Sequence, residues 1–313
     1  MLIVEDKKEK SFFINSAADI FTLLKISTDI FKSEGINSAR IDSELLLCRV
    51  LRVDRSYLYT YPEQKLEKSQ INEFSELVAL RKKRMPLQYL IGKQEFWSRD
   101  FIIKEGVFIP RPETERLIEI IIDDFEKLKI RTKVKNEDIR ILDIGTGSGV
   151  IAITLKCEMP FIKVCATDIS YEALKTAQLN AEIHIENGAV DFLLARSFET
   201  FRADSPSKDK PFHIVVSNPP YIPEGDCHKL QPEIAKYEPK EALFSGEEGI
   251  DMIKELIEEA PKFICPGGML ILEIGEGQKN MIKEIYAAVD KYDEINFYDD
   301  YSSYERVAQL WIK

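Results

Sequence analysis

A glycine-rich turn constrains this chain of 313 residues more than any other feature of its sequence. Residues 141–149 have the sequence Ile-Leu-Asp-Ile-Gly-Thr-Gly-Ser-Gly, an apolar strand that leads into three alternating glycines and then into a helix. Glycine lets the backbone approach a ligand closely, and the free N–H groups at a helix start can donate hydrogen bonds to it. A plain strand-to-helix turn would not need three glycines, so the segment predicts a ligand site.

Strand and helix patterns alternate around this turn. Strands are expected over 139–144, 161–167, 190–195, 212–217, 269–274, 294–299 and 306–312, and helices over 149–157, 170–184, 249–264 and 278–290. An amphipathic helix ending near Leu128 precedes them, and polar loops are expected over 129–138 and 202–211. Such alternation is typical of an α/β fold with a doubly wound, Rossmann-like parallel sheet.

The residues before this α/β region follow other patterns. Residues 16–85 carry helical periodicity without a strand pattern, beginning at a capping-box spacing over 16–19, whereas residues 95–104 are typical of a short hairpin. We therefore expect four segments: an N-terminal tail (1–15), a small helical bundle that serves docking (16–90), a hairpin linker (91–112) and the α/β domain (113–313).

Charge and composition exclude several classes of protein. Residues 1–90 hold 15 Lys and Arg against 13 Asp and Glu, whereas the remainder holds 28 against 41, so the α/β region is strongly acidic. This balance opposes binding through cations spread over phosphates. The five cysteines and three histidines lack metal-site spacing, and no apolar run is long enough to cross a membrane. We expect a cytoplasmic protein with reduced thiols, no metal and no membrane partner.

Asp168 ends the strand that follows the glycine turn, 19 residues beyond Gly149. A carboxylate there can accept hydrogen bonds from both hydroxyls of a ribose, as at the switch point of doubly wound sheets. The alternative is that Asp168 caps the helix beginning near Ser170. Together with the glycine turn, Asp168 favours a nucleoside cofactor, whose kind these two features leave open.

A third motif specifies the chemistry. The apolar strand that begins at Phe212 ends in Asn218, Pro219, Pro220 and Tyr221. The prolines fix φ and remove N–H donors, so that carbonyl oxygens point at a defined place. An Asn oxygen and a Pro carbonyl could accept both N–H bonds of a planar –NH2 group, with the Tyr221 ring stacked on it. This set favours methylation of a delocalised nitrogen through positioning and electrostatics, without a covalent protein nucleophile.

The chain resembles the release factor glutamine methyltransferases (the HemK/PrmC family) over about residues 17–313. Besides the glycine turn, with its acidic strand residue Asp143, and the N-P-P-Y motif, the similarity covers residues 35–47, 86–96, 108–115, 238–243 and 305–307. The resemblance implies transfer of a methyl group from S-adenosylmethionine to a glutamine side-chain amide, giving N(5)-methylglutamine. That glutamine belongs to the Gly-Gly-Gln loop of class I peptide chain release factors, the implied partners.

The resemblance also implies which residues form the site. Cofactor-binding residues would be Gly145, Thr146, Gly147, Ser148, Gly149, Asp168, Ser197 and Asn218. Substrate-binding residues would be Phe108, Pro110, Arg111, Thr114, Asn218, Pro219, Pro220 and Tyr221, of which the last four are also the catalytic residues. Thr114 has the alternative role of helix cap at the end of a rigid proline turn.

Several points stay open at this level. Where many methyltransferases carry an acidic residue near the adenine, residues 195–198 are Ala-Arg-Ser-Phe, so either Phe198 stacks on the base or a backbone group replaces the carboxylate. Residues 81–84 (Arg-Lys-Lys-Arg) complement a helix dipole or, less favoured, bind RNA. Glu273 ends a strand without a decided direction. A DNA or RNA exocyclic-amine methyltransferase is the alternative enzyme, opposed by the acidic charge, and a module that only binds the cofactor is the alternative non-enzyme.

Overall fold

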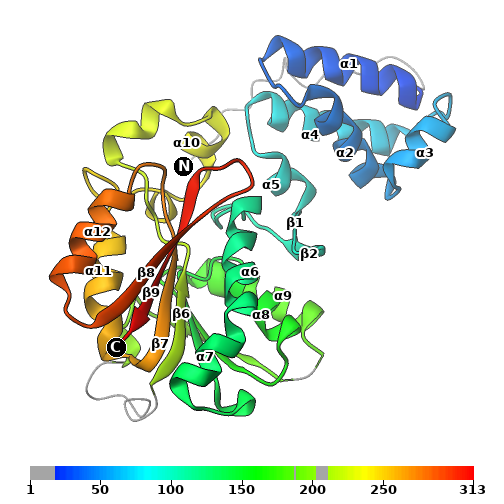
Figure 1. Cartoon of the computed structure of the whole chain (residues 1–313). Helices are drawn as coiled ribbons and strands as arrows, with labels where there is room; N and C mark the ends of the chain where they lie inside the picture. The colour runs from blue at the N-terminus through cyan, green and yellow to red at the C-terminus, as the bar shows by residue number, and fades with distance from the viewer. Residues whose placement is uncertain (1–17, 187, 202–210) are drawn as a thin grey trace. The chain divides into compact units, whose positions relative to one another are not determined.

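Figure 1 shows the computed structural model, which describes residues 18–186, 188–201 and 211–313. The chain forms two compact units. Unit 1 holds the residues up to Gly92 together with Pro232–Tyr237, and unit 2 holds Lys93–Gln231 and Glu238–Lys313. The expected tail over 1–15, the capping residue Ser16 and most of the expected loop over 202–211 lie outside the described residues.

Unit 1 is helical, as expected. Its helices are α1 (Ile20–Ser33), α2 (Ala39–Leu51), α3 (Arg55–Thr60), α4 (Lys68–Lys82), α5 (Leu87–Ile91) and α10 (Pro232–Tyr237). Asp19 caps α1 by accepting a hydrogen bond from the backbone N–H of Thr22 (2.8 Å). The apolar positions at helical spacing, among them Leu23, Phe31 and Phe74, form one buried core. The helical bundle expected over this part of the chain is confirmed, and α10, from a distant part of the sequence, is an additional member.

Unit 2 begins with the hairpin of β1 (Lys93–Phe96) and β2 (Arg99–Ile102), which therefore belongs to the α/β unit and is not a separate linker. The single helix expected to end near Leu128 is interrupted at Asp124, giving α6 (Glu115–Asp123) and α7 (Phe125–Thr132). Short 3₁₀ turns lie at Pro112–Thr114, Asn136–Asp138, Glu199–Phe201, Glu224–Lys229, Lys240–Ala242 and Ala260–Lys262.

A seven-stranded sheet forms the centre of unit 2 (Figure 1). Its strands are β3 (Arg140–Ile144), β4 (Lys163–Asp168), β5 (Val190–Leu194), β6 (Phe212–Ser217), β7 (Ile264–Glu273), β8 (Tyr292–Asp299) and β9 (Glu305–Ile312). They lie in the order β5-β4-β3-β6-β7-β9-β8. The pairs from β5 to β7 are parallel, whereas β9 runs opposite to the other six strands, so the sheet is mixed and not purely parallel as expected. The expected doubly wound sheet is confirmed, with all its strands near the expected positions.

Helices cover both faces of the sheet, because successive side chains of a strand point to opposite faces. Ile141 and Ile214 pack with α6, α7 and α8 (Val150–Glu158) on one face, where α9 (Tyr171–His184) also lies. Leu142 and Val215 pack with α11 (Asp251–Glu259) and α12 (Lys279–Ala288) on the other. Among the described residues, no helix is both long and apolar enough to cross a membrane.

The strand order reverses between β3 and β6, which are paired although β4 and β5 separate them in sequence. The crossover helices leave in opposite directions at such a point, so a crevice opens beyond the carboxyl ends of the strands. The glycine turn follows β3, Asp168 ends β4 and Asn218 follows β6. The topology thus brings together three motifs that the sequence separates by up to about 70 residues.

Candidate active site

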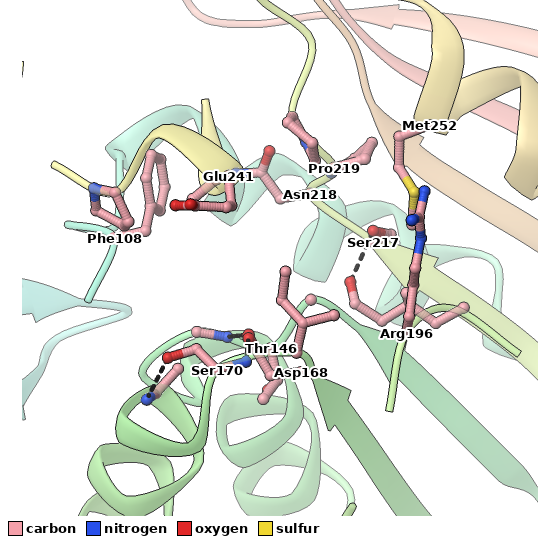
Figure 2. A pocket seen from close by; sticks show the side chains of 18 of the residues that line it. Phe108, Thr146, Asp168, Ser170, Arg196, Ser217, Asn218, Pro219, Glu241 and Met252 are labelled. Atoms are coloured by element: carbon pink, nitrogen blue, oxygen red, sulfur yellow. Dashed lines mark hydrogen bonds between the residues drawn. The ribbon is translucent and has the colours of Figure 1, made fainter. Parts of the chain in front are cut away.

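A cavity of about 760 Å³ opens at this point of unit 2. Its volume lies within the usual range for small-molecule sites. In Figure 2, Asn218 and Pro219 face Thr146 and Asp168 across the cavity, with Phe108 and Glu241 at one end and Arg196 and Met252 at the other. The residues expected from sequence that line it are Phe108, Pro110, Thr114, Gly145, Thr146, Gly147, Ser148, Asp168, Ser197, Asn218, Pro219 and Pro220.

The glycines of the turn have two different roles. Gly147 has φ +57°, and a Cβ placed on it would meet nothing within 4 Å, so this part of the turn presents bare backbone to the cavity. Gly149 does not line the cavity, contrary to its expected role in cofactor binding. A Cβ on Gly149 would lie 2.7 Å from Cδ1 of Ile153 and 3.0 Å from Cβ of Ala177. Its missing side chain therefore allows α8 to pack closely against α9.

Asp143 supports the turn from inside the protein. Its carboxylate is fully buried and accepts hydrogen bonds from the hydroxyl of Thr146 (2.7 Å) and the backbone N–H of Ala152 (3.2 Å). Burial raises the pKa of Asp143 to about 7, against the effect of these two donors. Asp143 does not line the cavity, so it anchors the turn to α8 and leaves ligand contact to other groups.

Asp168 connects the turn to α9. Its Oδ2 accepts a hydrogen bond from the N–H of Gly147 and its Oδ1 from the N–H of Ser170, both at 2.8 Å. Burial raises the pKa of Asp168, although these hydrogen bonds favour its charged form. The cap of α9 is Ser170, whose hydroxyl accepts from the N–H of Ala173 (3.2 Å). Asp168 is therefore not the helix cap, and its carboxylate lines the cavity.

Two buried hydroxyls on the cavity wall lack a protein partner. Oγ of Ser148 and Oγ of Ser197 make no hydrogen bond within the described part of the chain, although both residues are at least 96% buried. Ser197 also has φ +48°, an uncommon conformation for a non-glycine residue. Buried polar atoms are normally hydrogen-bonded. These two hydroxyls, the bare glycine backbone and the Asp168 carboxylate fit a ligand with a nucleoside part and a charged polar tail.

The motif after β6 forms a hydrogen-bonded chain with two residues distant in sequence. Nδ2 of Asn218 donates to Oγ1 of Thr114 (3.0 Å), and the Thr114 hydroxyl donates to Oε2 of Glu273 (2.6 Å). The Tyr221 hydroxyl donates to the other oxygen of Glu273 (3.1 Å). Thr114 thus makes no side-chain cap for α6, which excludes its alternative role. Sequence reasoning left the direction of Glu273 undecided, and the structure shows this residue behind the motif.

Tyr221 does not line the cavity, and the expected stacking face is therefore absent. Its ring packs against the core shared by α11 and α12, and burial raises the pKa of its hydroxyl. The Gln278 side chain donates a hydrogen bond to the carbonyl oxygen of Tyr221 (3.0 Å). The ring turns inward because its hydroxyl finds a buried acceptor in Glu273, which sequence patterns do not reveal.

The segment before α6 forms the end of the cavity at Phe108. Arg111 does not line the cavity, contrary to expectation. Its guanidinium lies 5.0 Å from the centroid of the Phe108 ring and pairs with Oε1 of Glu238 at 2.5 Å. Oε2 of Glu238 also accepts a hydrogen bond from the N–H of Ile109 (3.4 Å). Arg111 therefore supports the Phe108 ring on the side away from the cavity and connects it to Glu238.

The opposite end of the cavity settles the open question about Phe198. This ring is 1% exposed and stacks on Phe263, with centroids 4.6 Å apart and planes at 2°, so it is unavailable to a ligand. Residues that sequence reasoning missed on the cavity wall include Ile169, Met252 and Glu255. Ile169 is 56% exposed and directly follows Asp168, so the expected role of Asp168 could have indicated it. No motif lies next to Met252 or Glu255 in the sequence.

Comparisons with known proteins agree with this geometry. Residues 22–92 match the model of the PrmC N-terminal domain and residues 121–236 that of the methyltransferase small domain. The release factor glutamine methyltransferase of Koribacter versatilis is 41% identical over 79% of this chain and 83% of its own length. That of Coxiella burnetii is 39% identical over 86% of this chain and 90% of its own length.

A comparison of structures supports the fold alone. The hMettl16 catalytic domain, solved in complex with the MAT2A 3'UTR hairpin 6, has a TM-score of 0.52 and 13% identity, over 75% of this chain and 81% of its own. The level of sequence identity, over most of both chains, decides the family. This chain belongs to the release factor glutamine methyltransferases.

Proposed function

We propose that this enzyme transfers the methyl group of S-adenosylmethionine to the side-chain amide nitrogen of the glutamine in the Gly-Gly-Gln loop of class I peptide chain release factors, giving N(5)-methylglutamine. Family membership supports this reaction. The observation that carries the assignment to this site is the position of Asn218, on the cavity wall opposite Asp168 and beside two prolines without N–H donors. A substrate amide and a nucleoside cofactor can therefore meet in one cavity.

Asn218 and the proline turn would bind and orient the substrate amide. An amide nitrogen is a poor nucleophile because its lone pair is delocalised into the carbonyl group. The Asn218 oxygen and a carbonyl oxygen of the turn would accept both N–H bonds, which favours loss of planarity at the nitrogen. As the nitrogen bonds to the methyl carbon, the bond from that carbon to the sulfonium sulfur would break, S-adenosylhomocysteine would leave, and the nitrogen would release one proton to solvent. Such fixed acceptors act through orientation and electrostatics. S-adenosylmethionine supplies the electrophilic methyl group when it is bound.

The remaining wall would hold the cofactor. The backbone at Gly147 and the hydroxyl of Ser148 lie where the amino-acid part would pass, and Asp168 would accept from the ribose hydroxyls. At the far end, the exposed Ile169 and the residues around Ser197 would contain the adenine. A carboxylate is not needed there if the backbone at Ser197 supplies the polar contact.

A release factor, and not a nucleic acid, is the proposed partner. The acidic balance of the α/β region opposes the electrostatic binding of phosphates. In unit 1, two of the four cations over residues 81–84 are already paired: Arg81 and Arg84 both form ion pairs with Glu233 (3.0 and 2.8 Å). We assign docking of the release factor to unit 1 and the reaction to the cytoplasm, where release factors act.

The direct test incubates the full chain with labelled S-adenosylmethionine and three acceptors: a class I release factor, the same factor with its loop glutamine replaced by alanine, and DNA or RNA. We expect label only on the unaltered release factor, at the loop glutamine. Label on nucleic acid alone would support the alternative enzyme, and cofactor binding without transfer to any acceptor would support a binding module.

The role of Asp168 gives a quantitative prediction. Asp168→Ala should weaken cofactor binding by about 1.5–3 kcal/mol, the range for a hydrogen bond to a charged group. The helix α9 should persist, because Ser170 is its cap. Calorimetric titration measures the affinity, and Asp191→Ala on the neighbouring strand β5 is a matched control at an exposed carboxylate outside the cavity. Equal affinities of the two variants would remove Asp168 from the cofactor site.

A further inference from the structure

We propose that Glu273 and Thr114 are positioning residues that fix the orientation of the Asn218 amide, with its oxygen and not its nitrogen toward the substrate. This inference rests on the proposed function and extends it to Thr114, which lines the cavity, and to Glu273, which lies behind the cavity wall. A side-chain amide can turn by 180° with little change of shape, exchanging an acceptor for two donors. An acceptor is what a substrate –NH2 group requires, so a flipped Asn218 would oppose the reaction.

The hydrogen-bond chain settles the direction by counting protons. An ionised carboxylate only accepts hydrogen bonds, and a hydroxyl has one proton to donate. Thr114 donates this proton to Oε2 of Glu273 at 2.6 Å, so its oxygen can only accept from its other neighbour. That neighbour is Asn218 at 3.0 Å, which must therefore present its nitrogen to Thr114. The Asn218 oxygen is left as the acceptor at the cavity.

The surroundings of Glu273 favour this role over a purely structural one. Glu273 is 1% exposed at the end of the otherwise apolar strand β7, and burying a carboxylate destabilises a fold unless the charge is compensated. Its two oxygens accept from Thr114 and Tyr221, and the charge of Arg306 lies nearby. Burial raises the pKa of Glu273, whereas these three groups favour its ionised form. An apolar residue would pack there at lower cost, so the carboxylate indicates a function.

Thr114 is placed so that its hydroxyl links Glu273 to Asn218. It is the last residue of the 3₁₀ turn Pro112–Thr114, directly before α6, and it is 2% exposed. At most helix starts such a hydroxyl would accept from a backbone N–H of the first turn. Here it makes no such bond. Its hydroxyl instead bonds a residue at the end of β7 and a residue in the turn after β6. These two strands are neighbours in the sheet.

The test uses the full chain, a class I release factor and steady-state kinetics. Thr114→Val keeps the shape and removes the hydroxyl, whereas Thr114→Ser keeps the hydroxyl. We expect Thr114→Val and Glu273→Gln each to lower kcat by about tenfold, which lies within the range of coupling energies between residues of one hydrogen-bond network. KM and cofactor affinity should change little. Thr114→Ser should retain most of kcat. Thr176→Val is the matched control, because Thr176 is buried in α9 and its hydroxyl donates to a backbone carbonyl outside the cavity.

A mutant cycle separates positioning from general damage. If both residues act through Asn218, Thr114→Val and Glu273→Gln should lower kcat no further in an Asn218→Ala background. Losses that multiply in that background, or a Thr114→Val variant with the kcat of the wild type, would overturn the inference. Should Glu273→Gln fail to fold, the pair Thr114→Val and Thr114→Ser still decides. Failure of the proposed function would appear differently, as a wild-type enzyme that does not methylate the release factor.

Discussion

Replacing Asn218 with alanine is expected to lower kcat for methylation of a release factor by on the order of 10²–10³, as for loss of one preorganised hydrogen bond to a transition state. The variant loses the side-chain acceptor that holds one N–H of the substrate amide. Cofactor affinity should change little, because the glycine turn and Asp168 lie on the opposite wall of the cavity. The core of unit 2 should also persist, since Asn218 follows the buried strand β6 without belonging to it.

Steady-state methylation, followed by mass spectrometry of the release factor, measures this kcat directly. Asn296→Ala is the matched control, because Asn296 is a half-buried asparagine on β8 whose side chain bonds Glu294 and Gln309. It should methylate like the wild type. Asn218→Ala with the kcat of the wild type would contradict the proposed chemistry, and a parallel loss of cofactor affinity would place Asn218 at the cofactor instead.

The sheet could be predicted because its information is local. In strands buried on both faces, such as β6, most residues are apolar (four of six in β6), and turns and helices separate the strands. The two-unit organisation was harder to predict, because α10 lies about 140 residues beyond the rest of unit 1. Local sequence does not show that a short helix after β6 joins the N-terminal helices. The interruption of a helix at Asp124 has no glycine or proline to indicate it.

In the site, too, residues marked by a local motif could be predicted, whereas residues that depend on distant contacts could not. The glycine turn, Asp168 and Asn218 could be found because each carries a motif within a few residues, and topology alone then unites them. Glu273 could not be found, because its meaning depends on Thr114, 159 positions earlier. For a related reason, the stacking role expected of Tyr221 did not follow from its motif, and the role of Phe198 stayed open. Aromatic rings near a motif suit a ligand or a core equally, and only the packing of distant residues such as Phe263 decides.

The cations at the end of α4 lead to the second large effect. Arg81 is 5% exposed, and its guanidinium pairs with Asp42 (2.7 Å) and Glu233 (3.0 Å) while donating to the carbonyl of Met85 (3.1 Å). Arg81→Met should destabilise unit 1 by about 3–5 kcal/mol, the range for removing one partner of a buried ion pair. The variant leaves Asp42, which is 2% exposed, without its cation, whereas Glu233 keeps Arg84.

The two tryptophans make this prediction selective, because Trp97 and Trp311 both belong to unit 2. In urea titrations of the full chain, circular dichroism reports helices of both units and tryptophan fluorescence reports unit 2. Arg81→Met should move part of the dichroism transition to lower urea while the fluorescence transition stays in place. Arg49→Met, at an exposed position of α2, should change stability by less than about 0.5 kcal/mol. Equal shifts for both variants would mean that the buried ion pairs contribute little, and a shift in fluorescence would mean that the two units unfold together.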